Sequence, residues 1–215
     1  MNILFSQFLI ETLFLTIIFL HLSKKNLGAV WAYGLQSFAI AVLLFNSFLE
    51  TGSLSLLGIA FLVLVVKVIL ATQFFTRLIK KNQLLFSANT YLNTPLTLAV
   101  LAMLTAIAHS QKLVPLTNII SANATLLSLA LSAMLLSIFL TINRKSALSQ
   151  IIGILSLENS IVAFAIFAGL EQSPSLQIGI LFDISIWLTI ATAFISMIYA
   201  HFGSLDITSM KNLTD

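Results

Sequence analysis

The sequence predicts an all-α protein that crosses a membrane several times. Apolar residues make up 59% of the 215-residue chain and charged residues only 8%, against roughly 25% charged residues in ordinary soluble domains. The apolar residues gather in runs of about 20, the length at which an α-helix crosses a hydrocarbon core of roughly 30 Å. The ten Lys and Arg and seven Asp and Glu residues are too few to cover a water-facing fold of this size. Most of its surface is therefore expected to face lipid.

A window of about 20 apolar residues predicts seven transmembrane helices in an integral membrane helix bundle. They lie near residues 3–22, 28–49, 54–78, 94–109, 118–142, 147–170 and 176–201. The fourth is the shortest, but Asn93-Thr94-Pro95 is a favourable helix start, since Pro is tolerated in the first helical turn. We expect a single membrane domain over 1–215, with three helices in 1–80, a connector with the fourth helix in 81–116 and three helices in 117–215.

The distribution of basic residues predicts the orientation. With seven spans and the N-terminus outside, eight Lys and Arg residues fall on one side and only Lys112 on the other. The eight are Lys24, Lys25, Arg77, Lys80, Lys81, Arg144, Lys145 and Lys211. Omitting the fourth span makes the ratio six to three. Because basic loops stay in the cytoplasm, seven spans with a cytoplasmic C-terminus are favoured. Lys24 and Lys25 follow the apolar segment Met1–Leu22 and no basic residue precedes it, which favours a retained first helix over a cleaved signal peptide.

No chemistry-bearing motif is present in the sequence. The chain has no Cys, which excludes disulfides, thiolate zinc sites and Cys-ligated clusters. His21, His109 and His201 lie near predicted helix ends and are too scattered for a metal site. Walker loops, nucleophile elbows and zinc-protease motifs are absent. We therefore expect no catalytic residue, cofactor, metal or nucleic-acid partner, and any redox chemistry would reside in a partner protein.

Four ionisable residues fall inside predicted helices: Glu11, Lys67, Glu158 and Asp183. Each costs roughly 2.5–3.5 kcal/mol at the bilayer centre on insertion scales, so such residues usually mark an ion or proton path. Lys67 and Glu158 lie near the midpoints of their spans. If the last two helices form a hairpin around 171–174, Glu158 and Asp183 differ in depth by only about 5 Å, at 1.5 Å per residue.

A row of two carboxylates and a lysine at that depth can load and release protons near neutral pH, because burial and neighbouring charge shift proton affinity in opposite directions. Small polar neighbours could hold bridging water; they are Ser156, Asn159, Ser160 and Ser185. The alternative is that the charges only join helices in static pairs. Glu11 is nearer the outer end, so it could also extend to the interface or face a water pocket.

An internal duplication is indicated by two similar segments. Phe19-Leu-His-Leu-Ser-Lys-Lys precedes a helix with Tyr33-Gly-Leu-Gln-Ser37, and Phe139-Leu-Thr-Ile-Asn-Arg-Lys precedes one with Ser156-Leu-Glu-Asn-Ser160. The basic pairs are 120 residues apart and Leu35 and Leu157 are 122 apart. If the duplication is real, helices one to three and five to seven are parallel repeats and the fourth is a connector.

The run Gln150-Ile-Ile-Gly-Ile-Leu-Ser-Leu-Glu158-Asn159 resembles the charged helix of hydrogenase-4 component E, a membrane subunit of formate hydrogenlyase-type complexes. Further stretches fit the same family over most of the chain: Tyr33-Gly-Leu-Gln36-Ser37, Lys67-Val-Ile-Leu, and Gly179-Ile-Leu-Phe-Asp183 with the tail Gly203-Ser-Leu-Asp206. The last three helices are also similar to NADH-quinone oxidoreductase subunit K and to the C subunit of Mrp cation/proton antiporters. Glu158 matches the first acidic position of those proteins, and Asp183 falls near the second, where subunit K has glutamate.

These resemblances imply a non-catalytic subunit of a membrane oxidoreductase complex in the bacterial inner membrane. It would help to translocate protons beside antiporter-like subunits, with Glu158, Asp183 and Lys67 as relay residues and Glu11 as a weaker candidate. The alternatives are a subunit of a multi-protein cation/proton antiporter without a redox partner, and a structural assembly subunit whose buried charges are static.

Overall fold

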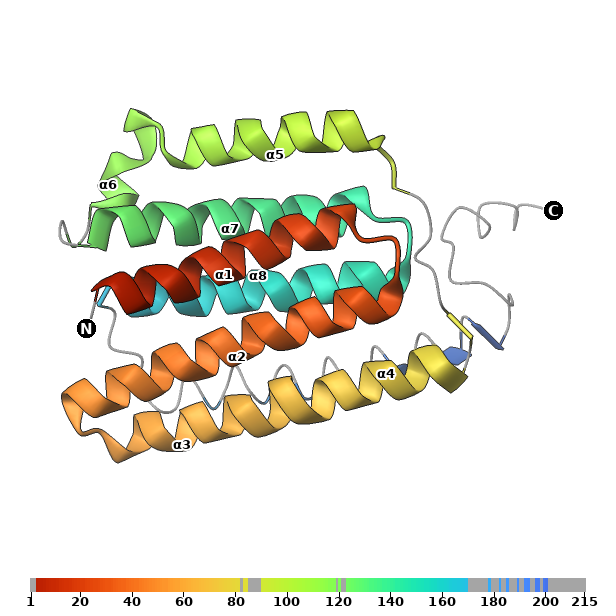
Figure 1. Ribbon diagram of the computed structural model, residues 1–215, viewed down its shortest axis with the longest axis horizontal. Helices are drawn as coiled ribbons and strands as arrows, with labels where there is room; N and C mark the ends of the chain where they lie inside the picture. Colours follow the sequence, from red (N-terminus) through yellow and green to blue (C-terminus); the bar gives the residue numbers. More distant parts are fainter. Residues whose placement is uncertain are drawn as a thin grey trace.

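The computed structural model of the chain is a bundle of long helices that run side by side (Figure 1). It describes residues 3–81, 83–84, 90–118, 120, 123–169 and single positions between 178 and 200. The helices are α1 (Ile3–Leu22), α2 (Asn26–Thr51), α3 (Leu54–Val63), α4 (Thr72–Lys81), α5 (Thr94–Ala108), α6 (Val114–Thr117), α7 (Ala124–Asn143) and α8 (Ala147–Phe167). A π-helix, Leu64–Ala71, joins α3 to α4, and a 3-10 turn, Gln111–Leu113, precedes α6. The predicted all-α class is confirmed for this part of the chain.

Five helical segments of the described chain are long and apolar enough to cross a membrane. They are α1, α2, the continuous segment Leu54–Lys81, α7 and α8. A sixth span results if α5 and Gln111–Thr117, which are bent by 51° at their junction, count as one. The predicted helix over 176–201 lies outside the described residues apart from single helical positions, so the seventh span and the orientation stay predictions.

Large apolar side chains cover the outside of the bundle, and polar ones lie within it. Leu4, Trp31 and Leu54 are 77%, 70% and 80% exposed. The buried polar side chains include Gln36 and Ser132, both fully buried. Lipid tolerates such an apolar surface, whereas a water-soluble protein rarely shows large contiguous apolar patches. The fold is compatible with a multi-pass membrane protein.

Two helical hairpins with the same first helix length and the same turn length form the centre of the bundle. Each has a helix of 20 residues, α1 or α7, a three-residue turn and a second helix, α2 or α8. The first helices start at 3 and 124 and the second at 26 and 147, so the offset is 121 residues in both cases. Helix α1 packs against α2 and α7, and α8 packs against the same two helices. This correspondence agrees with an internal duplication of these two helices.

Arg144 joins the turns of the two hairpins. Its guanidinium donates to the backbone carbonyl oxygens of Leu20, His21 (3.0 Å) and Ser23 (2.9 Å). These carbonyls belong to the C-terminal end of α1, where helices leave acceptors unpaired and carry partial negative charge. Burial lowers the pKa of the Arg144 guanidinium. Arg144 therefore clamps α1 from inside the bundle instead of facing water as a loop charge.

Asparagine residues precede both α5 and α7, and their side chains bond differently. The predicted start at Asn93 is confirmed, since the Asn93 side chain accepts from the Leu96 amide at 3.0 Å. The predicted helix start at 118 is wrong, because α7 begins at Ala124 and a short helix, α6, precedes it. Asn123 instead donates to the Phe167 carbonyl oxygen at the end of α8, at 3.0 Å. Asparagine often makes such side-chain bonds to backbone in place of continuing a helix.

Gly153 sets the approach of α7 to α8, and its replacement tests this packing. A Cβ at Gly153 would lie 2.5 Å from Thr141 Oγ1 and 3.1 Å from the Thr141 backbone nitrogen. Because backbone cannot move aside locally, we expect Gly153→Ala to separate the helices and lower the apparent midpoint of thermal denaturation in detergent by several degrees. A Cβ at Gly58 meets nothing within 4 Å, so Gly58→Ala is the matched control and should not lower the midpoint. Equal midpoints for both variants would contradict the close approach.

Candidate functional site

Lys67 lies in the π-helix Leu64–Ala71, near the middle of the span Leu54–Lys81. Helical segments with π-type bonding are rare and are frequently found at functional sites. The Lys67 side chain is only 1% exposed, and the residues around it in the π-helix are apolar. Its ammonium group therefore needs partners from other helices.

Those partners come from α8 and, through it, from α2. Lys67 Nζ lies 3.0 Å from Glu158 Oε1 and donates to Asn159 Oδ1 at 2.8 Å. Asn159 Nδ2 in turn donates to Ser37 Oγ on α2 at 3.1 Å. Lys67, Asn159 and Ser37 are buried, whereas the Glu158 side chain is 21% exposed. A continuous polar chain thus crosses three helices inside the bundle.

The ion pair is balanced in charge, which explains how it is tolerated in an apolar interior. Taking either charge out of water alone is costly, and removing one partner of a buried pair costs about 3–5 kcal/mol. The hydrogen bond to Asn159 adds a second acceptor for the three protons of the ammonium group. Protonation of Glu158 would break this balance, so the arrangement couples the proton content of Glu158 to that of Lys67.

The structure describes three of the four ionisable residues that the sequence singled out. It brings Lys67 and Glu158 into contact. Glu11 lies on α1, where Gln7 Nε2 donates to its Oε1 at 2.8 Å within the same helix. Asp183 lies outside the described residues, so its predicted place at the level of Glu158 stays a prediction.

The histidines of the described chain have structural contacts. His21 stacks on Phe139 with ring centroids 5.1 Å apart, and its Nε2 lies 3.0 Å from the Leu136 carbonyl oxygen. His109 follows α5, and its Nδ1 lies 2.9 Å from the Thr105 carbonyl oxygen. Within the described residues no group of three or more His, Cys, Asp and Glu could hold a metal ion.

Two members of the polar chain were not assigned their roles from sequence. Asn159 was expected only to hold water, yet it contacts Lys67 directly. Ser37 was noted only within the repeated and family-like segment. The sequence held a signal that relates these two residues. Ser37 and Asn159 are 122 residues apart, the same spacing as Leu35 and Leu157, so they stand at equivalent positions of the two proposed repeats.

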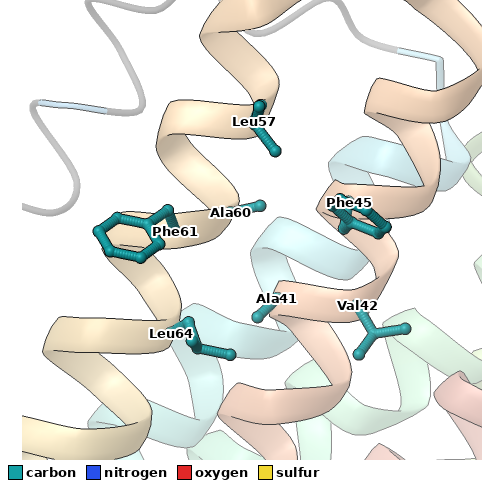
Figure 2. Close-up of a pocket in the computed structure, with 7 residues that line it drawn as sticks. All are labelled: Ala41, Val42, Phe45, Leu57, Ala60, Phe61 and Leu64. Carbon is teal, nitrogen blue, oxygen red and sulfur yellow. The ribbon is translucent and has the colours of Figure 1, made fainter.

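An apolar hollow of about 250 Å³ lies between α2 and α3 (Figure 2). Its lining consists of Ala41, Val42, Phe45, Leu57, Ala60, Phe61 and Leu64. None of these side chains can donate or accept a hydrogen bond or carry a charge. The hollow offers nothing to orient a polar substrate, so the ion pair is the stronger candidate for a functional site.

Comparisons with models of known protein families, with curated proteins and with solved structures found no match to this chain.

The Asn159 bridge can be tested by comparing two substitutions. Asn159→Leu removes an acceptor from Lys67 and the donor to Ser37, so it should lower stability by about 1–3 kcal/mol, the range for leaving a buried polar group unsatisfied. Ser37→Ala removes only the outer acceptor and should cost less. Thermal denaturation of the two purified variants in the same detergent gives the comparison. If Asn159→Leu is as stable as the parent chain, the bridge does not contribute as described.

Proposed function

We propose that the chain is a non-catalytic membrane subunit that contributes to proton translocation in a hydrogenase-4 or complex I-related assembly of the bacterial inner membrane. The observation that carries this proposal is the buried Lys67–Glu158 pair near the middle of two membrane-length helices. Intramembrane ionisable residues that face a bundle interior commonly belong to proton paths. The family resemblance of the segments around both residues supplies the kind of assembly.

The pair can pass a proton without any covalent chemistry. A proton that binds Glu158 neutralises the carboxylate and leaves the Lys67 ammonium without its counter-charge. Lysine readily changes its protonation when buried, so Lys67 then releases a proton and the interior returns to zero net charge. Glu158 is the more exposed of the two residues and is the better point of entry. Asp183 is the proposed next acceptor, and Glu11 is a secondary candidate on α1.

A structural role is the second candidate, and the balanced charge of the pair favours it. A static pair would hold α8 against the span Leu54–Lys81 and would need no proton exchange. A cation/proton antiporter subunit is an alternative within transport, because the same pair could serve an assembly that has no redox partner.

Neutralising both members of the pair distinguishes relay from scaffold. Lys67→Met or Glu158→Gln alone leaves one buried charge unpaired and should reduce the amount of folded chain in the membrane. The double variant removes both charges, so we expect its accumulation to recover toward the parent level while proton translocation by the complex falls at least tenfold. A pH-sensitive dye in membrane vesicles measures translocation, and Glu50→Gln, at an exposed helix end, is the control. Parent-level translocation by the double variant would leave only the structural role.

Gentle-detergent purification of the tagged chain tests the proposed partners. We expect antiporter-like membrane subunits to co-purify, together with hydrogenase-like or quinone-reductase-like soluble subunits, as identified by mass spectrometry. Antiporter subunits alone would support the ion-exchange alternative. A chain that purifies alone would contradict both assemblies.

A further inference from the structure

A polar face of α2 continues from the ion pair toward one end of the bundle. Asn26, Tyr33 and Ser37 stand at positions i, i+7 and i+11, so they lie on one side of the helix. All three are buried, and so is the neighbouring Gln36. At 1.5 Å per residue the face from Asn26 to Ser37 extends over about 16 Å. Ala29 and Val30 are buried apolar residues between Asn26 and Tyr33 on this side of the helix.

The side chains along this face carry polar atoms without partners. Within the described part of the chain, both Gln36 amide atoms make no hydrogen bond. The same is true of Asn26 Oδ1 and of Ser156 Oγ on the adjacent helix α8. Proteins satisfy nearly all buried polar groups, and they use ordered water where no protein atom is within reach. Such atoms on two helices that pack together therefore indicate bound water.

Tyr33 links these groups to the ion pair. Its hydroxyl interacts with the Ser37 side chain, which accepts from the Asn159 amide that also contacts Lys67. Ser156 precedes Glu158 by two residues on α8. Among the described residues of α2 and α8, the unpartnered groups thus lie on the N-terminal side of the polar chain formed by Ser37, Asn159 and Lys67, except for Asn46 Nδ2 near the far end of α2.

In the opposite direction the fully buried side chains of α2 and α8 are apolar. The buried residues of α2 after Ser37 and of α8 after Ser160 are Ala39, Ile40, Ala41, Leu43, Leu44, Val162, Ala163, Ala165 and Phe167. The one polar atom found there without a partner in the described chain is Nδ2 of the half-buried Asn46, close to the end of α2. The fully buried polar side chains nearest the ion pair therefore lie toward the end that holds the α1–α2 and α7–α8 turns.

We propose that Tyr33, Gln36 and Ser156 bind ordered water and form a half-channel between the Lys67–Glu158 pair and the end of the bundle at these two turns. The water carries protons to Glu158 by exchange along its hydrogen bonds. This role in proton delivery rests on the proposed function, whereas the binding of water does not.

The absence of Cys from the chain provides a direct test. A single Cys introduced at Ser156 or at Ala163 is the only thiol in the protein, and both positions are fully buried on α8. The two positions are seven residues apart and share a helix face. The full-length chain is reconstituted in lipid vesicles and transferred to D₂O, and infrared spectroscopy follows loss of the S–H stretching band.

We expect the thiol of Ser156→Cys to exchange at least tenfold faster than that of Ala163→Cys. In a second pair on α2, the thiol of Gln36→Cys should likewise exchange faster than that of Ile40→Cys. This pair replaces the first pair if one of its variants does not fold. Equal exchange within a folded pair would overturn the half-channel. Fast exchange at 36 and 156 together with parent-level translocation by the neutral Lys67/Glu158 variant would retain the water site and reject the proposed function. Slow exchange at 36 and 156, together with loss of translocation in the neutral Lys67/Glu158 variant, would reject the water site and retain the proposed function.

Discussion

The buried pair of Lys67 and Glu158 constrains the rest of the bundle. Each charge is stable in the apolar interior only while the other lies within about 3 Å, since an unpaired charge there carries a large desolvation cost. The pair therefore fixes which faces of the span Leu54–Lys81 and of α8 meet, and it fixes the position of each helix along the axis of the other. The hydrogen bonds through Asn159 to Ser37 extend the same constraint to α2.

The helix ends are held by polar side chains that bond to backbone. Arg144 binds carbonyls at the end of α1, and Asn143 accepts from the Leu92 amide before α5. Asn26 donates to the Leu84 carbonyl beyond α4. In lipid the hydrophobic effect does not drive one apolar helix against another, so close packing and hydrogen bonds determine which helices associate. Gly153 provides such close packing between α7 and α8.

The two hairpins share the length of the first helix and of the turn but differ in chemistry. At the spacing of 122 residues that relates Ser37 to Asn159, Gln36 corresponds to Glu158. Gln36 is neutral and unbonded within the described chain, whereas Glu158 carries the charge that Lys67 requires. If the two hairpins are copies of one ancestral unit, one copy therefore carries a carboxylate where the other carries a neutral amide.

The sequence by itself determined the helical class, most helix bounds and the approximate depth of Lys67 and Glu158. These properties follow from local apolar runs, helix-start residues and the fixed rise of a helix, so no tertiary information is needed. The sequence did not predict that α7 starts at Ala124, because side-chain bonds to a distant helix compete there with helix formation. Only the tertiary structure decided that Lys67 contacts both Glu158 and Asn159, and that the Arg144 side chain is buried and binds the end of α1. Lys67 and Asn159 are 92 residues apart, and which face of each helix meets the other depends on the packing of the whole bundle.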